Sequence, residues 1–542
     1  MRKFQRIIAL VFAVVMLAAC SDGDAPQSSQ PSQVGNSSAS GDGDASAVQP
    51  ITFTFFDKNK GDMFDDPVAK EIIRRTGVTL EIQQPTTDSE EKLTLMLTGG
   101  DYADMILFSR TSASLQSYVD SGALLPLNDL IEEHGPNIKK MYGDVLNMSR
   151  YPDGNIYYLN SWYGMDPDPV YGVCMRMDYA QELAGDKATT GEYFTLDEYY
   201  QMLVDFKEKY PSINGAESIP LSINGEALST TLATFKGMFG IETYYLEGDN
   251  VYFDLRHPRY IEVFKFLNKC YLAGLVDTEW VSVKRDLWEQ KLASDTVFST
   301  AAAWWDPGNA NTTLQSMHDN DSAAQFFAYK VVPEGMDPSG LKLGGRSTLG
   351  WDGVAITDKC KDPVRAIQFL DFLVSEEGQY LLNWGVEGEH WDMVDGVHTP
   401  RQEVLDALKE DINSVVVQMG IRKWNYCIKN GNGEDGTPYD LIYKLDRADI
   451  DTFAIKSLAD TNFDNTPYQG LTTFAPNSEE GMINQAITEE LTKYQPRIIM
   501  AESEAECVRL YEELVQRLDE LGADKVEAYM TAKYQEKLSL WE

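Results

Sequence analysis

Residues 51–108 read ITFTFFDKNKGDMFDDPVAKEIIRRTGVTLEIQQPTTDSEEKLTLMLTGGDYADMILF and alternate strand-like with helix-like segments. Three segments rich in β-branched and aromatic residues are expected to form strands: 51–56, 78–82 and 103–108. Asp66 and Pro67 are a typical helix start and Gly77 a typical helix end, and a second helix is expected from Ser89 to the glycines at 99–100. This alternation predicts a parallel α/β sheet.

The chain begins with a tripartite segment that is typical of secretion signals. A positive head at residues 2–6 is followed by an apolar run over 7–19, which is shorter than the ~20 residues that a membrane-spanning helix needs. The run ends in Leu-Ala-Ala before Cys20 and resembles the lipobox of bacterial lipoproteins. We therefore expect residues 1–19 to be a cleaved signal peptide and Cys20 to be lipidated, an ordinary signal with a coincidental cysteine being the alternative.

Residues 20–50 are expected to contain the lipidated cysteine and a disordered linker. Residues 21–49 are nearly all Ser, Gly, Asp, Ala, Gln or Pro, which bury too little apolar surface to offset the entropy of ordering.

The cysteines beyond Cys20 are odd in number and have no Cys-x-x-Cys spacing, so neither a disulfide framework nor a zinc site is expected. We interpret them as buried small apolar residues and leave one isolated disulfide open.

The chain is strongly acidic, with a formal net charge of −39 and a pI near 4.4. This charge repels phosphate backbones and anionic headgroups, so neither nucleic acid nor a lipid surface is an expected partner.

The sequence has no P-loop, strand-linked GxGxxG, GxSxG or HExxH signature. Acidic stretches from Asp57 and from Asp460 faintly resemble calcium loops, but both lack the final glutamate, so no metal and no cofactor is expected.

Capping boxes mark two further helices. Thr195 and Glu198 are expected to begin one helix, and Ser503 and Glu506 another that runs to Gly522. In the second of these, helical spacing predicts one inward face, formed by Val508, Tyr511, Val515 and Leu518.

Aromatic residues stand beside polar ones in five loop-like segments: 160–166 (NSWYGMD), 301–309 (AAAWWDPGN), 350–353 (GWDG), 387–392 (EGEHWD) and 422–426 (RKWNY). Sugars present apolar C–H faces that stack on aromatic rings and hydroxyl groups that bind carboxylates, amides or guanidinium groups. This mixture therefore favours a saccharide site. The 301–309 segment follows an expected strand, and ligands of open α/β sheets collect beyond the carboxyl ends of strands. Packing in the core or between lobes is the alternative role for any single tryptophan.

Several segments in order resemble the family 1 extracellular solute-binding proteins of ABC importers, in their large Gram-positive lipoprotein branch. They include LTLMLTGGDYADMI (93–106), SGALLPLNDLIEEHGPNI (121–138), DGNIYYLN (153–160) and the return segment that begins DGVAITDKC at residue 352. The acidic loop NGNGEDG (430–436) and the number of cysteines depart from the family pattern.

The resemblance implies an α/β, bilobed type 2 periplasmic-binding-protein fold, with two α/β lobes, an interlobe cleft and a hinge. Lobe 1 would hold residues 51–165 with 350–400, and lobe 2 residues 166–349 with 401–542. It further implies a monomeric, non-enzymatic, lipid-anchored component of an ABC importer on the extracellular face of the cytoplasmic membrane. This component would capture an oligosaccharide or related carbohydrate by hinge closure and deliver it to the permease subunits.

We expect the ligand to be bound by rings that stack on sugars and by polar groups that bind hydroxyls. The ligand-binding candidates are Trp304, Trp305, Asp306, Trp162, Tyr163, Trp351, Asp352, Trp391, Glu389, Arg346, Asp57 and Asp101. Two alternative functions stay open. A secreted carbohydrate-active hydrolase would need only a pair of carboxylates, and a surface carbohydrate sensor would use the same fold to signal to a receptor.

Overall fold

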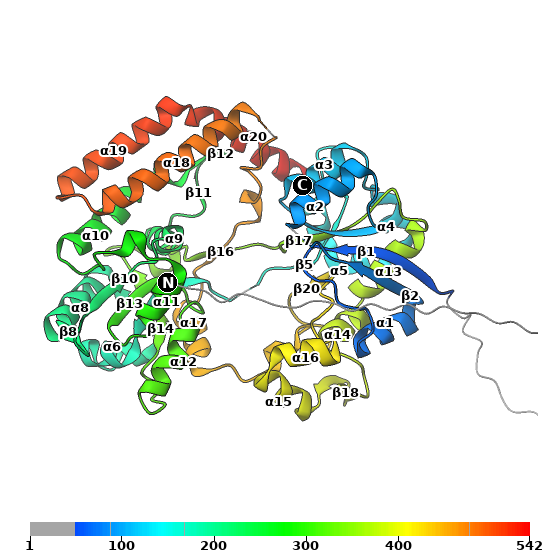
Figure 1. Ribbon diagram of the computed structural model, residues 1–542, viewed down its shortest axis with the longest axis horizontal. Helices are drawn as coiled ribbons and strands as arrows, with labels where there is room; N and C mark the ends of the chain where they lie inside the picture. Colours follow the sequence, from blue (N-terminus) through cyan, green and yellow to red (C-terminus); the bar gives the residue numbers. More distant parts are fainter. Residues whose placement is uncertain (1–48, 87, 167, 476, 542) are drawn as a thin grey trace, which may run out of the picture. The chain divides into compact units, whose positions relative to one another are not determined.

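The computed structural model describes residues 49–541 except 87, 167 and 476 (Figure 1). The expected signal peptide, the lipidated Cys20 and nearly all of the linker lie outside the described residues. The unit that begins at Val48 contains two principal sheets. Among the described residues, no helix combines the length and the apolar character that a membrane span requires.

The first sheet confirms the expectation for residues 51–108. Its strand order is β2-β1-β3-β17-β4; β1 is parallel to β2 and β3, whereas β17 is antiparallel to β3 and β4. The strands are β1 (Ile51–Asp57), β2 (Val78–Gln83), β3 (Met105–Ser109), β4 (Leu159–Asn160) and β17 (Asp352–Ile356). The sheet is therefore completed by a strand that returns from far along the chain.

Side chains of the first sheet alternate between two cores because successive residues of a strand point to opposite faces. Phe53 and Phe55 of β1 join one core and Phe56 the other. The first core is covered by α1 (Pro67–Thr76), α4 (Asn128–His134), α5 (Pro136–Tyr142), α13 (Pro363–Val374), α14 (Glu376–Trp384), α15 (Gln402–Glu410) and α16 (Ile412–Met419). The second is covered by α2 (Ser89–Gly99) and α3 (Ala113–Asp120), which Figure 1 shows on the side of the sheet away from α1.

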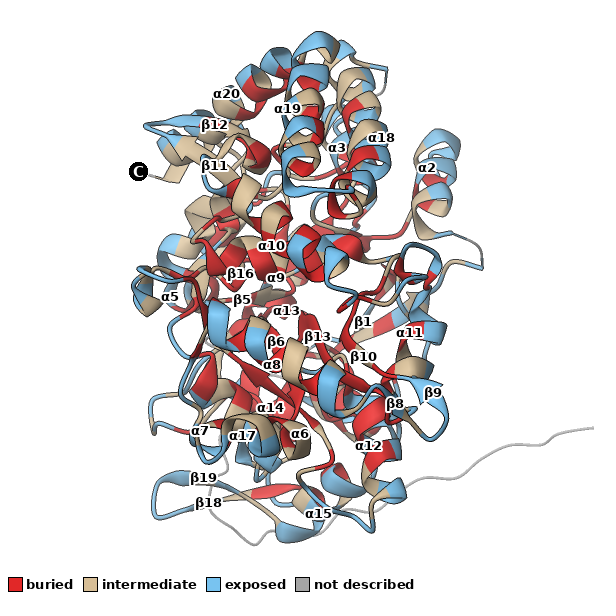
Figure 2. Ribbon diagram, turned by 90° about the vertical axis from the view of Figure 1, so that its left-hand side faces the viewer, coloured by how far each residue is buried: buried red, intermediate tan, exposed pale blue. Residues whose placement is uncertain are grey.

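The second sheet has the order β10-β13-β6-β14, with β10 parallel and β6 antiparallel to β13. Its strands are β6 (Tyr171–Arg176), β10 (Ile219–Ser222), β13 (Val297–Ala303) and β14 (Phe326–Tyr329). Every residue of β13 is buried, and Figure 2 shows buried residues along these strands beneath the helices. We call the first sheet with its two cores the first lobe, and the second sheet with its own core the second lobe.

The second lobe is mainly helical around its sheet. Its helices are α6 (Met177–Ala184), α7 (Lys187–Thr190), α8 (Leu196–Lys209), α9 (Leu228–Met238), α10 (Tyr260–Leu272), α11 (Arg285–Leu292), α12 (Gly308–Met317), α17 (Asp449–Ser457), α18 (Glu479–Ile499), α19 (Glu504–Leu521) and α20 (Ala523–Trp541). Two-stranded pairs complete the fold: β5 (Trp162–Tyr163) with β20 (Ile428–Lys429), β7 (Phe194–Thr195) with β15 (Val331–Val332), β8 (Ser212–Ile213) with β9 (Ala216–Glu217), β11 (Tyr244–Glu247) with β12 (Asn250–Phe253), β16 (Gly344–Arg346) with β21 (Asn462–Asp464), and β18 (Trp391–Val394) with β19 (Val397–Pro400).

Helix boundaries follow the local signals in the sequence. In α1 the Asp66 carboxylate accepts from the amide of Ala69, and Gly77 ends the helix at a φ of 68°. The capping box of Thr195 and Glu198 begins α8 as expected. In α19 the predicted inward face is confirmed at Leu518 and in part at Tyr511, which is half-buried against the second lobe's core, whereas Val508 and Val515 are only half-buried. The buried residues there are Cys507, Leu510, Leu514 and Leu518.

Two further findings concern the cores. Buried residues of the segment 404–441 belong to the first lobe's core, although the sequence analysis assigned residues from 401 onward to lobe 2. The five cysteines of the described residues are buried and free, which agrees with their interpretation as small apolar residues. Burial raises the pKa of each thiol, to about 11 at Cys360 and to about 12 at Cys427.

Candidate functional site

The carboxyl ends of β1 and β3 lie at the point where the strand order of the first sheet reverses. The chain passes from β1 to β2 on one side and then to β3 on the other, and open α/β sheets bind ligands outside the strand ends at such a point. Asp57 ends β1, Arg110 follows β3, and Asp352 begins β17 opposite Ser109. Three segments that are distant in sequence therefore meet at one edge.

Asp57 is completely buried at this edge. Its carboxylate accepts hydrogen bonds from the Tyr426 hydroxyl at 2.6 Å and from the Asn59 amide at 2.8 Å. Burial first, and then the charge of Asp57, raise the pKa of the Tyr426 hydroxyl well above its ordinary value, so the tyrosine is the donor. In this arrangement Asp57 holds the loop after β1 in place rather than facing solvent.

The loop after β1 is joined to the beginning of β17 by an ion pair. The Lys58 ammonium lies 3.0 Å from a carboxylate oxygen of Asp352, and the Asn59 side-chain amide donates to the other oxygen at 3.3 Å. An ammonium group, an amide and a carboxylate thus form one cluster. Such groups bind the hydroxyls of a sugar by donating to and accepting from them.

Trp351 stands directly beside this cluster, and its side chain is 83% exposed. The backbone that presents it is fixed: its carbonyl accepts from the Arg110 amide at 2.9 Å, and the Gly350 amide donates to the Trp162 carbonyl at 2.7 Å. A Cβ at position 350 would lie 2.7 Å from the Cβ of Trp162, so this close approach requires glycine. A rigid loop therefore holds an indole ring in solvent.

The carboxyl end of β13 forms the corresponding edge of the second lobe. Trp304 is half-buried and its indole N–H donates to the Pro169 carbonyl at 3.0 Å, whereas Trp305 is 46% exposed. The two rings meet edge to face, with centroids 5.3 Å apart. Asp306 accepts from the Ala303 amide at 3.2 Å, so its carboxylate is fixed at the strand end.

Two arginines flank this edge. The Arg285 guanidinium of α11 lies 3.4 Å from Asp306, and Arg346 lies over the Trp305 ring at 5.6 Å from its centroid. Arg346 also pairs with Asp166 at 3.3 Å and donates to the Asp168 carbonyl at 3.0 Å. These contacts place Arg346 where chain segments cross between the lobes.

Three segments cross between the lobes at this place: 164–170, 345–351 and 441–449. The Gly164 amide donates to the Thr348 carbonyl at 2.8 Å, which joins the first two segments, and Arg447 pairs with Asp168 at 2.9 Å, which joins the first and third. Because each segment connects one lobe's core to the other's, a change in its backbone angles moves the lobes relative to each other, which suits the three segments to act as a hinge.

The remaining sequence-based candidates are less exposed or lie away from the two edges, although Trp162 contacts Gly350 beside Trp351. Trp162 is half-buried against the first lobe's core, and Tyr163 is buried and stacked on Tyr142 with centroids 3.7 Å apart. Trp391 is buried on the β18–β19 hairpin, where its indole N–H donates to the Gly385 carbonyl at 2.8 Å. The neighbouring Glu389 is exposed.

Asp101 is also exposed, and it precedes β3 instead of following it. Because β3 is parallel to β1, the residue lies at the amino ends of the strands, the edge opposite to Asp57. The structure thus brings Asp57, Trp351 and Asp352 together at one edge, and Trp304, Trp305, Asp306 and Arg346 at the other.

Several polar groups of these edges were not among the residues predicted from the sequence. Lys58, Asn59 and Arg110 directly follow strands, so the strand-end rule that identified Asp306 was a sufficient signal for them as well. Arg285 lies on a separate helix, and only tertiary packing brings it to Asp306. No local pattern marks it.

Replacing Asp57 by alanine is expected to lower the free energy of unfolding by about 1–3 kcal/mol, because the Tyr426 hydroxyl and the Asn59 amide lose their buried acceptor. Urea unfolding followed by circular dichroism measures the loss. The control is Asp62→Ala in the same loop, where the side chain is exposed. An Asp57→Ala chain as stable as the Asp62→Ala chain contradicts the structural role.

Residues 68–384 match the family model described as bacterial extracellular solute-binding protein. Lipoprotein LipO of Bacillus subtilis is 22% identical over 445 residues, which cover 79% of this chain and 82% of that protein. The fructooligosaccharide ABC transporter substrate-binding protein FusA of Streptococcus pneumoniae is 26% identical over 353 residues, covering 60% of this chain and 61% of FusA.

Solved structures show the same fold at low identity. An extracellular solute-binding protein from Bifidobacterium longum subsp. infantis aligns with a TM-score of 0.69 at 17% identity, over 90% of this chain and 98% of that one. FusA in complex with kestose aligns with a TM-score of 0.62 at 17% identity, over 90% of this chain and 100% of that one. These alignments confirm the bilobed α/β fold that the sequence analysis expected.

Proposed function

The chain belongs to the bacterial extracellular solute-binding proteins, and from this premise we propose that it is the lipid-anchored, carbohydrate-capturing component of an ABC importer. Its ligand is an oligosaccharide or related carbohydrate, bound between the two lobes. Its partners are the transmembrane subunits of a permease, to which the loaded protein docks as a monomer.

The positions of the exposed tryptophans are the main support for a carbohydrate ligand. Among the described residues only Trp305 and Trp351 have exposed indole side chains. Trp305 follows the carboxyl end of β13 in the second lobe, and Trp351 lies beside the carboxyl end of β3 in the first lobe, where its carbonyl accepts from the Arg110 amide. A large apolar ring left in water at such an edge costs free energy unless a ligand covers it, and an indole matches the C–H face of a pyranose or furanose ring.

Polar groups beside each ring supply the contacts to hydroxyls. Asp352 with Lys58 stands next to Trp351, and Asp306 with Arg285 stands next to Trp305. A ring flanked by fixed donors and acceptors fits a sugar better than an apolar solute or a peptide backbone.

Transport function requires that ligand binding change the conformation. A ligand that contacts both edges binds the closed arrangement of the lobes more tightly than the open one, and so shifts the hinge equilibrium toward closure. The crossing segments near Arg346 absorb this motion. The closed protein then presents both lobes to the permease, and no covalent bond is made or broken.

The names of relatives support the same ligand class. FusA is named for fructooligosaccharides, and its structure was solved with kestose.

For the division of the chain, we propose that residues 51–165 and 350–441 form lobe 1 and that residues 166–349 and 442–541 form lobe 2. This division follows the core to which the segment 404–441 contributes.

A thermal-shift screen of oligosaccharides, with peptides as the comparison class, tests the proposed function. We expect at least one oligosaccharide to raise the melting temperature with a concentration dependence that gives a Kd, since a ligand that binds only the folded state stabilises it. Stabilisation by peptides with no response to any saccharide contradicts the proposal.

Lipidation at Cys20 is tested separately in a Gram-positive host that is fed labelled palmitate. We expect the label in the parent chain and its loss in Cys20→Ala, with Ser21→Ala as the control that retains it. Label that never enters the parent chain, or that persists in Cys20→Ala, rules out this anchor.

A further inference from the structure

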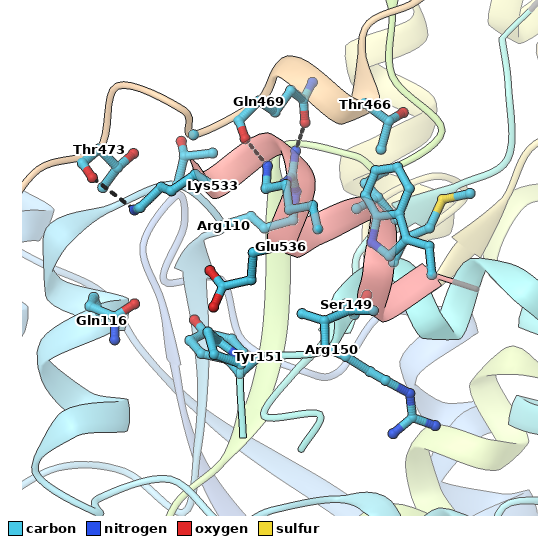
Figure 3. Close-up of a pocket in the computed structure, with 18 of the residues that line it drawn as sticks. Arg110, Gln116, Ser149, Arg150, Tyr151, Thr466, Gln469, Thr473, Lys533 and Glu536 are labelled. Atoms are coloured by element: carbon cyan, nitrogen blue, oxygen red, sulfur yellow. Dashed lines mark hydrogen bonds between the residues drawn. The ribbon is translucent and has the colours of Figure 1, made fainter. Parts of the chain in front are cut away.

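A cavity lies between α20 and the first lobe, apart from the two strand-end edges, and nothing in the proposed function uses it. It has a volume of about 200 Å³ and is lined by the loop after β3, the residues around Tyr151, the loop around Gln469 and the last turns of α20. Figure 3 shows Arg110 donating to Gln469 on one side of it and Lys533 extending to Thr473. The volume is below the roughly 300–1,000 Å³ of sites for drug-sized ligands, so the cavity takes a single small unit.

Four cationic side chains line this cavity in a chain whose net charge is −39, and three of them, Arg110, Lys533 and Lys537, have only neutral hydrogen-bond acceptors. The Arg110 guanidinium donates to the Gly350 carbonyl at 2.9 Å and to the Gln469 side-chain oxygen. Lys533 donates to the Thr473 carbonyl at 3.0 Å, and Lys537 to the Gln469 carbonyl. All these acceptors are neutral. Within the described part of the chain none of the three cations forms an ion pair with a carboxylate.

Lys537 shows that this concentration of positive charge is costly. Burial first, and then the neighbouring charges of Arg110 and Lys533, lower the pKa of its ammonium group to about 7. A lysine in this state is stabilised as a cation by any anion that enters the cavity.

The other charged groups at the cavity do not supply that anion. Arg150 is turned away in Figure 3, donating to Asn147 and to the Gly154 carbonyl. Glu536 lines the cavity but is exposed, and Figure 3 shows its carboxylate directed toward Tyr151. Burial raises the pKa of Tyr151 and of Tyr158, so both phenols are neutral.

We propose that this cavity binds the carboxylate-bearing unit of an acidic saccharide, with Arg110, Lys533 and Lys537 around the carboxylate and the rings of Tyr151 and Trp541 against the sugar. The saccharide part of this inference rests on the proposed function. The cavity adjoins the proposed carbohydrate site through Arg110, whose amide bonds to the Trp351 carbonyl at 2.9 Å. It therefore defines the substrate class as a uronate-containing carbohydrate.

Binding of a carboxylate is expected to depend on pH through Lys537. The bound anion raises the lysine pKa above its value of about 7 in the free protein, so binding above pH 7 takes up a proton. Affinity is therefore constant below pH 7 and falls by up to about tenfold per pH unit above it. No histidine lines the cavity to produce the same profile.

Isothermal titration calorimetry with matched sugars tests the proposal. The probes are D-galacturonate and D-glucuronate, their neutral counterparts D-galactose and D-glucose, and inorganic sulfate, each at pH 6 and pH 8.5.

We expect a uronate to bind at least tenfold more tightly than its neutral counterpart at pH 6, and this difference in affinity to become smaller at pH 8.5. Lys537→Gln should remove both the difference and its pH dependence. Arg110→Gln should lower the affinity while the pH dependence remains, because arginine stays charged.

The matched control is Lys525→Gln, an exposed lysine of the same helix whose partner is Glu479. It should behave as the parent chain. Equal affinity for the uronates and their neutral counterparts, or a difference that survives in Lys537→Gln, overturns the inference. Sulfate that binds as tightly as the uronates overturns its saccharide part. The proposed function is tested independently by the binding of neutral oligosaccharides to the parent chain and to Trp351→Ala. Trp351 does not line this cavity.

Discussion

Replacing Trp351 by alanine is expected to weaken oligosaccharide binding about 30-fold and to leave the melting temperature unchanged. The indole is 83% exposed on a loop that backbone hydrogen bonds fix, so its removal deletes a stacking surface and opens no cavity. Central aromatic contacts are worth about 2 kcal/mol or more, which corresponds to ~30-fold in Kd, whereas exposed substitutions change stability by about 0.5 kcal/mol or less. Calorimetry with the best oligosaccharide of the screen measures the loss.

Trp305→Ala is expected to change affinity in the same direction, because the second lobe presents its ring in the same way. Arg346 would lose the ring that it covers, so part of the effect arises from a displaced guanidinium. Tyr193→Ala is the matched control: this ring is 43% exposed but lies between α7 and β7, away from the strand ends. Binding within about twofold of the parent in both tryptophan variants contradicts the proposed site.

Replacing Arg176 by methionine is expected to lower the free energy of unfolding by about 3–5 kcal/mol. Arg176 is fully buried at the end of β6, where its guanidinium pairs with Asp295 at 2.7 Å and with Asp178 at 2.6 Å. Methionine fills a similar volume but leaves the buried Asp295 carboxylate without this partner, and breaking a buried pair in this way costs far more than the pair contributes. Urea unfolding of the second lobe, followed by tryptophan fluorescence, measures the loss.

Arg509→Met is the control for this variant. Arg509 pairs with Glu513 at 2.9 Å on the surface of α19, and exposed pairs of this kind contribute about 1 kcal/mol or less. The difference between the two variants isolates the effect of burial. A loss below about 1 kcal/mol in Arg176→Met would show that the guanidinium is not buried as described.

Local signals made much of the fold predictable. Helices could be placed from caps such as Asp66 and Ser503, and strands from the apolar runs of β1 and β13. Capping hydrogen bonds and apolar runs depend only on residues that are close in sequence. The face that α19 buries was not predictable in the same way. Two apolar stripes one residue apart run along this helix, and only its contacts with α10 and α18 select the stripe at Leu510 and Leu514.

The site was predictable to the extent that it depends on strand ends. Trp305 and Trp351 were predicted as site residues because each is an aromatic residue beside polar ones in a loop-like segment, which is a local pattern. The same pattern at Trp391 belongs to a hairpin whose ring is buried, and burial is decided by packing against Tyr380 and His398. Which lobe core receives residues 404–441 likewise depends on tertiary contacts that no short segment encodes.

The position of a bound carbohydrate tests the central claim most directly. A crystal structure with the tightest oligosaccharide of the screen is expected to show one ligand in contact with both Trp305 and Trp351, with hydroxyls bonded to Asp352 or Asp306. A ligand bound away from both indoles, or stacked on only one lobe, would contradict capture between the lobes.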